Sequence, residues 1–155
     1  MDNLTMLNPY SFFVRSFAQE AHLKDCTFLD YRGGGGNHSD GFAGGDGSTV
    51  DGCYFATADD AIKLYDDITV TNTTIEMVQN CVPIQLGWGD YPDGAVGTFK
   101  NLTIVGSRGR TNSDNAVISG RRGKYTVTLH IDGLHVRNPN AVLVSLWGED
   151  MILEG

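Results

Sequence analysis

A degenerate repeat runs along the chain and limits the folds that the chain can adopt. Five segments begin with Asp, Asn or Gly and lead into a short alternation of apolar residues. The apolar markers of these segments are separated by 27, 20, 29 and 32 residues, and they are Phe28, Phe55, Ile75, Ile104 and Val136. A repeat of about 20–30 residues that contains no convincing helix is typical of a solenoid.

A second short apolar segment follows most of the repeats, at residues 61–65, 83–87, 116–119 and 141–147. Two short strands per repeat, joined by turns of unequal length, predict an all-β fold, a right-handed parallel β-helix of about five or six coils. Successive coils of such a fold lie about 4.8 Å apart. A β-sandwich is disfavoured because hairpin dipeptides between neighbouring strands are scarce. We expect one domain, over residues 1–155.

The composition agrees with a fold that is rich in strands and turns. The 155 residues include 20 Gly, 15 Asp and 13 Thr but only 4 Glu and 4 Lys. Glu and Lys populate helix surfaces, whereas Asp and Gly populate turns and Thr suits strands. A helical bundle is therefore excluded. We expect the glycine-rich residues 33–47 to form a flexible loop.

The two ends of the predicted solenoid differ in what covers them. Residues 1–22 form either an N-terminal cap or an irregular first coil, and the apolar pattern of residues 10–21 slightly favours an amphipathic cap helix. The last strand-like run has no obvious cap after it. Because an uncovered coil end offers unpaired backbone groups, we expect a homo-oligomer through the coil ends, or truncation there.

Charge and sequence pattern bound the partners. The net charge of −8 and the pI near 4.7 argue against a nucleic-acid partner. No apolar run reaches the roughly 18 residues that cross a membrane, and the first residues do not resemble a signal peptide. No compartment is assigned.

The odd set of Cys26, Cys53 and Cys81 predicts buried thiols rather than disulfides or a zinc site.

Three carboxylates are the strongest candidates for chemistry. Asp40 and Asp60 are 20 residues apart, which is the shortest interval among the markers, so we expect them side by side on neighbouring coils. Such a pair can hold and polarise a water molecule, while the adjacent Asp59 acts as a proton donor. Strict alternation turns Asp60 inward, so the chain must bend here for Asp59 and Asp60 to share one groove. Together the three residues match the chemistry of inverting glycoside hydrolysis.

Other functions for the glycine runs and for the three carboxylates are less favoured. The run of glycines from Gly33 lacks the Gly-Lys-Ser/Thr ending of a phosphate-binding loop, and residues 44–49 miss the Asp of a calcium-binding solenoid repeat. A calcium ion on Asp40, Asp59 and Asp60 ranks below catalysis, although carboxylates suit hard cations. We predict no metal and no cofactor.

Three motifs resemble those of glycoside hydrolase family 49, the dextranase and isopullulanase family. The motifs are Ser39-Asp40-Gly41, the run Asp59-Asp60-Ala61-Ile62-Lys63-Leu64-Tyr65, and the run Val82-Pro83-Ile84-Gln85-Leu86-Gly87-Trp88. Their order and spacing match the family over about residues 37–90. The resemblance implies a right-handed parallel β-helix that hydrolyses α-glucans with inversion and, as for related enzymes, secretion.

The resemblance also implies roles for individual residues. The resemblance implies that Asp59 is the general acid. It implies that Asp40 and Asp60 together act as the base that activates the attacking water. A substrate groove for a polysaccharide or oligosaccharide is implied to be lined by Lys63, Tyr65, Gln85 and Trp88. A second hypothesis stays open: a non-catalytic carbohydrate-binding or structural β-helix module that self-associates through its coil ends.

Overall fold

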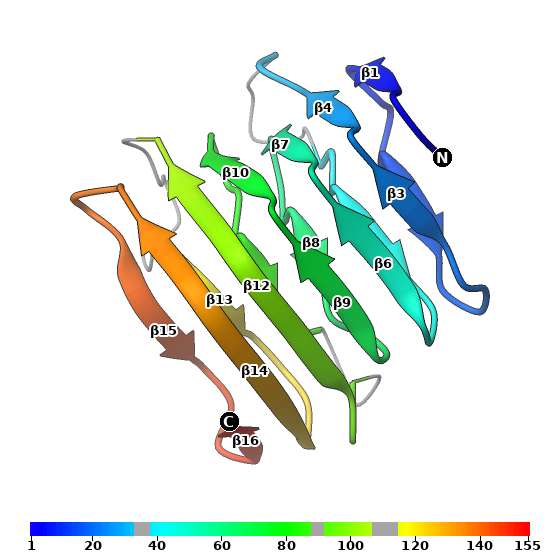
Figure 1. The fold of residues 1–155 in the computed structure, drawn as a ribbon. Coiled ribbons are helices and arrows are strands. Elements are labelled where there is room, and N and C mark those ends of the chain that lie inside the picture. Colours follow the sequence, from blue (N-terminus) through cyan, green and yellow to red (C-terminus); the bar gives the residue numbers. More distant parts are fainter. Residues whose placement is uncertain (33–37, 88–91, 107–114) are drawn as a thin grey trace.

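A computed structural model describes residues 1–32, 38–87, 92–106 and 115–155. The described residues form strands and turns and contain no helix, and hence none that could cross a membrane (Figure 1). A ten-stranded sheet, sheet A, and a six-stranded sheet, sheet B, account for all the strands of these described residues. Sheet A contains β1 (Thr5–Leu7), β3 (His22–Lys24), β4 (Thr27–Leu29), β6 (Ser48–Asp51), β7 (Tyr54–Thr57), β9 (Ile68–Thr71), β10 (Thr74–Met77), β12 (Val96–Val105), β14 (Tyr125–Val136) and β16 (Met151–Glu154). Sheet B contains β2 (Val14–Ser16), β5 (Phe42–Gly44), β8 (Ile62–Lys63), β11 (Ile84–Gln85), β13 (Ala116–Gly120) and β15 (Val142–Leu146).

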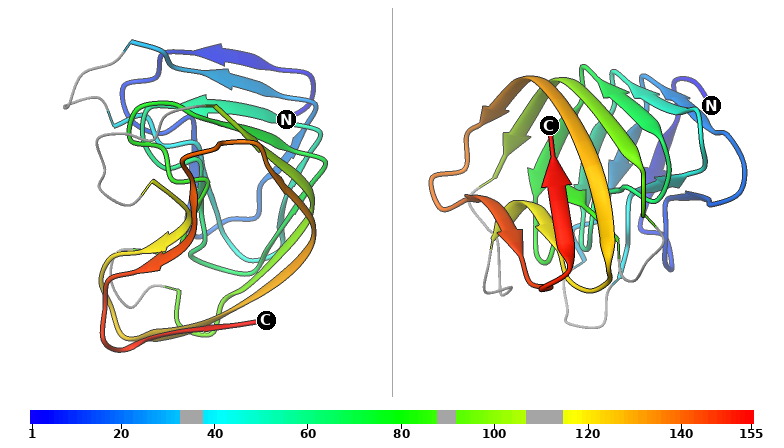
Figure 2. Two further views of the ribbon diagram at one scale, coloured as in Figure 1. Left: turned by 90° about the vertical axis from the view of Figure 1, so that its left-hand side faces the viewer. Right: turned by 90° about the horizontal axis from the view of Figure 1, so that it is seen from below.

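Every strand pair in the described ranges is parallel. The chain winds round a common axis, so that sheet A curls about the core and sheet B closes the opposite side (Figure 2). Strands of sheet B are ordered β2, β5, β8, β11, β13 and β15, which is chain order. The predicted all-β parallel β-helix is thus confirmed. The number of coils stays a prediction.

The repeat that was visible in the sequence is the stacking register of sheet A. Phe28 pairs with Phe55, Phe55 with Ile75, Ile75 with Ile104, and Ile104 with Val136, so all five markers occupy equivalent positions. Four of the five side chains are fully buried, and the rings of Phe28 and Phe55 stack with centroids 4.9 Å apart. This apolar ladder forms the centre of the core, because inward positions of successive coils face one another.

The polar residue that opens each repeat forms a sharp corner. Asp25, Gly52, Asn72, Asn101 and Gly133 all have positive φ, between 50° and 77°. Asn, Asp and Gly tolerate this left-handed conformation better than other residues, which explains their recurrence. The side-chain amide of Asn101 donates to Asn72 Oδ1 (2.9 Å), and that of Asn72 donates to Asp51 Oδ1 (2.8 Å). Hydrogen bonds therefore link the corners of neighbouring coils.

One local expectation was wrong and a second was wrong in part. Residues 10–21 contain no helix: β2 lies in this segment and pairs with β5, so the segment is an irregular first coil. The predicted flexible loop over residues 33–47 also fails in part, because β5 lies within it and its three residues are buried. Residues 33–37 lie outside the described residues. Pairing with the next coil overrides the local patterns in both places.

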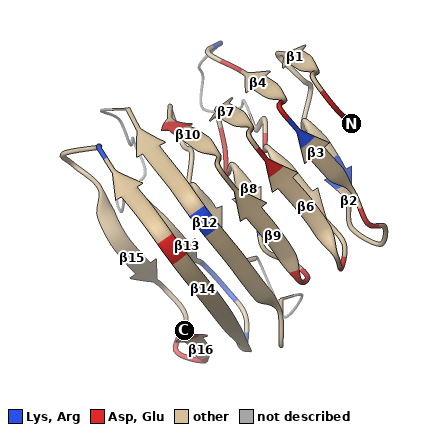
Figure 3. Cartoon of the chain, in the orientation of Figure 1, with Lys and Arg blue, Asp and Glu red and all other residues tan. Residues whose placement is uncertain are grey.

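The outer face of sheet A carries separate charges of alternating sign (Figure 3). Lys24 pairs in register with Asp51, and Lys100 pairs in register with Asp132, with Thr71 between the two pairs. Opposite charges at directly paired positions favour this register over others.

The thiols of Cys26, Cys53 and Cys81 are free and buried, as expected.

Candidate functional site

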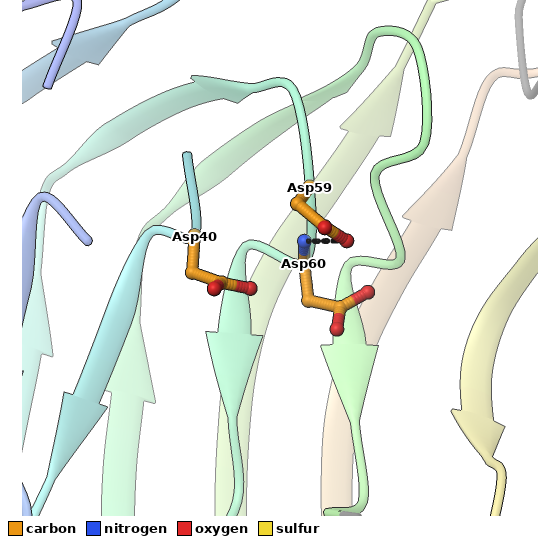
Figure 4. A group of neighbouring side chains, drawn as sticks. All are labelled: Asp40, Asp59 and Asp60. Atoms are coloured by element: carbon orange, nitrogen blue, oxygen red, sulfur yellow. Dashed lines mark hydrogen bonds between the residues drawn. The ribbon is translucent and has the colours of Figure 1, made fainter. Parts of the chain in front are cut away.

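Three aspartates meet where strands of sheet B begin. Asp40 precedes β5 and Asp60 precedes β8, and these two strands are in register through Phe42 and Ile62. The backbone N–H of Gly41 donates to the carbonyl of Asp60 (2.8 Å), which joins the two coils next to the carboxylates. One oxygen from each of Asp40, Asp59 and Asp60 lies within 4.8 Å of the other two (Figure 4). The 20-residue interval thus places Asp40 and Asp60 on neighbouring coils, as predicted.

A bend before β8 brings Asp59 to the same place as Asp60. Residues 58–61 lie between β7 and β8 outside any strand, so the alternation of side chains is broken there. The N–H of Ala58 donates to Ser39 Oγ (3.0 Å), which holds the bend against the preceding coil. The N–H of Asp60 donates to Asp59 Oδ1 (3.0 Å), drawn as the dashed line in Figure 4. Both acids therefore face the same side of sheet B.

Lys63 lies against the carboxylates rather than on the open surface. Its Nζ is 2.9 Å from Asp40 Oδ1 and 3.1 Å from Asp60 Oδ2, and all three side chains are at least 90% buried. Lys63 Nζ also lies 5.6 Å from the centroid of the Phe12 ring, within cation–π range. The structure thus places the ammonium group as an internal counter-ion of two acids.

Burial sets the protonation of this cluster. Desolvation raises the pKa of Asp40 to about 6, against the opposing effect of the Lys63 ammonium. The pKa of Asp60 is also raised, first by desolvation and further by the Asp59 and Asp40 carboxylates, while Lys63 again opposes the shift. Burial alone would lower the pKa of Lys63, but the Asp60 and Asp40 carboxylates raise it. A permanent cation therefore lies beside two carboxyl groups whose pKa values are raised, and such a site holds a proton near neutral pH.

Asp59 has different surroundings. Its Oδ2 is 2.9 Å from Nδ1 of His38, whose side chain is largely exposed, and its Oδ1 accepts a hydrogen bond from Asn80 Nδ2 (3.1 Å). The N–H of Asp59 is 3.4 Å from the Ser39 carbonyl. Groups from three neighbouring coils therefore orient this side chain between the solvent and the buried pair.

A cleft of about 250 Å³ opens beside the acids. It is lined by polar side chains with one apolar wall, from Asp59, Asp60, Asn80, Val82, Gln85, Ser119 and Arg121. Carboxylate, amide, hydroxyl and guanidinium groups together offer both donors and acceptors of hydrogen bonds. Asp40 and Lys63 are absent from the lining and lie behind Asp60. The cleft therefore contacts Asp59 and Asp60 directly and the other two through Asp60.

The residues implied to line a substrate groove occupy different places. Gln85 lines the cleft, but both ends of its amide bond the backbone of Gly87, at 2.8 and 3.0 Å. Tyr65 is half-buried outside the cleft, and its ring packs edge-on against Phe17 with centroids 5.4 Å apart. Lys63 is in the buried ion pairs, in register with Gln85 on the next coil. Trp88 lies outside the described residues.

Four residues of the site were missed from the sequence: His38, Asn80, Ser119 and Arg121. The repeat contained a signal for one of them. Asn80 lies 21 residues after Asp59, close to the interval between Asp40 and Asp60, and its N–H bonds the carbonyl of Ala58. Ser119 is in register with Gln85 on the coil that follows. Extending the acid interval by one more coil would have found Asn80, whereas Ser119 lies 34 residues after Gln85 and is placed only by the register of the strands.

The three carboxylates also have the arrangement of oxygen ligands for a cation. The Lys63 ammonium already supplies positive charge between Asp40 and Asp60, and a second cation there would be repelled. The position of Lys63 therefore disfavours a metal ion between Asp40 and Asp60. Comparison of the chain with protein-family models, with curated proteins and with solved structures finds no match.

Proposed function

We propose that the protein is a polysaccharide-active glycoside hydrolase that uses Asp59, Asp40 and Asp60 on an α-glucan of the dextran or pullulan type. The observation that carries the proposal is the convergence of the three carboxylates beside a polar cleft, which Asp59 and Asp60 line. Carboxyl groups from different coils meet the need of glycoside hydrolysis for one acid and one base. The three sequence motifs that resemble glycoside hydrolase family 49 supply the substrate class.

In the proposed mechanism, Asp59 protonates the leaving oxygen of the glycosidic bond. Asp60, supported by Asp40, accepts a proton from the water that attacks the anomeric carbon. The Lys63 ammonium group balances one negative charge on Asp40 and Asp60. One of these two carboxyl groups can therefore be ionised. His38, on the solvent side of Asp59, orients this acid. Between turnovers Asp60 releases to solvent the proton it took from water, and His38 passes a proton from solvent back to Asp59.

The distances make the stereochemistry part of the test. Inverting enzymes commonly separate the two carboxyl groups by about 6.5–9.5 Å, and retaining enzymes by about 5–5.5 Å. Here the nearest oxygens lie within 4.8 Å of one another, so inversion is supported by the resemblance rather than by the separation. Release of the α-anomer from an α-glucan, followed by NMR early in the reaction, would contradict the inverting scheme.

The primary experiment measures reducing-sugar release from dextran, pullulan and starch. We expect release by the parent protein, and a fall of at least 100-fold in Asp59→Asn and Asp40→Asn. Asp67→Asn is a matched control, because Asp67 lies outside the cleft and accepts a hydrogen bond from the Val96 N–H. Release that persists in both site variants would reject the catalytic roles.

A second candidate function is a structural β-helix module that self-associates through its coil ends. One observation favours it: an apolar opening of about 420 Å³ at β13–β16, lined chiefly by Ile118, Leu129, Ile131, Leu134, Leu143, Val144 and Leu153. Exposed apolar patches of this kind mark contact surfaces. Light scattering across a range of concentrations tests the idea: we expect a dimer or larger assembly that Leu143→Asp disrupts. A monomer at all concentrations would reject it.

A further inference from the structure

A ring–cation pair lies next to the cleft, on the side away from the acids. The guanidinium carbon of Arg121 is 4.8 Å from the centroid of the Trp147 ring, and Arg121 also lines the cleft. The Trp147 N–H donates to the Gly120 carbonyl (3.0 Å), so Trp147 follows β15 on the coil beyond Arg121. The pair thus extends the cleft by one coil along the solenoid axis.

The indole of Trp147 is held in place yet remains accessible. Its Nε1 donates to Ser145 Oγ (2.9 Å), and the guanidinium group of Arg121 covers part of its surface. Nevertheless 55% of the residue is exposed, which is unusual for a Trp that serves only packing. A large aromatic surface kept in contact with water and oriented by two neighbours is typical of a binding residue.

Polar side chains form a row that connects this ring with the acids. Lys63 is in register with Gln85, Gln85 with Ser119, and Ser119 with Ser145. Because paired positions of a parallel sheet repeat at about 4.8 Å, the row follows the axis of the solenoid. Gln85 and Ser119 from this row line the cleft. An extended ligand that starts at Asp59 would therefore cross Ser119 before it reaches Arg121 and Trp147.

We propose that Trp147 and Arg121 form a subsite for a neutral hexopyranose ring of the substrate. The apolar face of a pyranose packs on the indole, while the edges of the guanidinium group and the hydroxyl of Ser119 donate hydrogen bonds to the sugar hydroxyls. The cleft already contains the carboxylates of Asp59 and Asp60, which disfavour an anionic saccharide. This inference rests on the proposed function for its ligand class.

The test measures binding in the Asp59→Asn background, so that turnover does not consume the ligand. The probe is an α-1,6-linked gluco-oligosaccharide of four to six units, added to the protein in isothermal titration calorimetry. We expect Trp147→Ala to weaken binding about tenfold, which is about 1.4 kcal/mol, and Trp147→Phe to weaken it less, because Phe retains part of the stacking surface. Tyr10→Ala is the matched control, since Tyr10 is a fully exposed aromatic residue outside the cleft.

The outcomes separate this subsite from the hydrolase proposal. Loss of binding in Trp147→Ala alone supports the subsite even when no variant releases reducing sugar, a result that would reject only the hydrolase. Equal binding by the parent, Trp147→Ala and Tyr10→Ala overturns the subsite even if hydrolysis is observed. Binding of an oligogalacturonate in place of the glucan, or of neither saccharide, also overturns it. Unchanged circular dichroism and melting temperature confirm that the variants are folded.

Discussion

The ammonium group of Lys63 lies 2.9 Å from Oδ1 of Asp40, with both side chains removed from solvent. The same ammonium group contacts Asp60, so one positive charge serves two carboxyl groups. Isolated buried carboxylates are strongly disfavoured, and a buried cation is equally so without a partner. The three groups therefore depend on one another for charge balance.

The pH dependence of activity follows from the pKa of Asp40. In the proposed mechanism Asp40 must be ionised to support the base, so kcat/KM is expected to rise with pH through about 6. Initial rates of reducing-sugar release between pH 4 and pH 8 test this. A rate that falls continuously over the same range would contradict the assignment of Asp40 to the base.

The stability of the fold is expected to change with pH in the opposite sense. The raised pKa of Asp40 means that the folded state keeps a proton up to about pH 6, whereas the unfolded chain releases it near 3.8. This contribution is fully present below about pH 3.8 and is lost as the pH rises through 6; it is on the order of 3 kcal/mol. Urea unfolding of the parent and of Asp40→Asn at several pH values measures it. Parallel curves for the two proteins would contradict the prediction.

Removal of the buried cation tests the charge balance. Lys63→Met should lower the free energy of unfolding at pH 7 by about 3–5 kcal/mol, because Asp40 and Asp60 lose their counter-ion. Adding Asp40→Asn and Asp60→Asn to Lys63→Met should restore part of this loss, since neutral amides need no counter-ion. Denaturant unfolding provides both values. A triple variant less stable than Lys63→Met would show that the loss comes from packing and not from charge.

The hydrogen bonds that link the corners of neighbouring coils lead to a separate prediction about stability. Asn72 has φ of 50° and takes part in two side-chain hydrogen bonds, with Asp51 and Asn101. Asn72→Ala should cost about 2–3 kcal/mol, from the left-handed backbone and the lost hydrogen bonds. Asn72→Gly keeps the conformation accessible and should cost about half as much. Thermal unfolding compares the two, and equal losses would assign the whole effect to the hydrogen bonds.

The contact between His38 and Asp59 is expected to matter for catalysis more than for folding. His38 is largely exposed, so His38→Ala should leave the melting temperature nearly unchanged. Loss of a hydrogen bond to a carboxylate should lower kcat about tenfold and alter the pH profile of kcat. Asn80→Ala is the comparison, because it removes the other side-chain donor to Asp59 without removing a titratable group. An identical pH profile in both variants would reject a proton-transfer role for His38.

The sequence by itself determined the periodicity of the fold. Polar corner residues such as Asn72 and apolar markers such as Phe55 recur because each coil must turn at the same place and bury the same position. These requirements are local or repeat at each coil, so they leave a visible pattern. The pairing of Asp40 with Asp60 followed from the same interval. The predicted helix at residues 10–21 failed because pairing of β2 with β5 outweighed an amphipathic pattern.

The tertiary structure alone decided what surrounds the acids. A Cβ at Gly41 would collide with the carbonyl oxygen of Ala61 on the next coil, so the two coils approach closely beside the acids. Lys63 resembled a groove residue and became a buried counter-ion, and Trp147 came to lie against Arg121 from a neighbouring coil. Such contacts depend on the lengths and paths of the turns between coils. Stacking brings residues about 20–30 positions apart to within hydrogen-bond distance, and only the folded chain shows which of them meet.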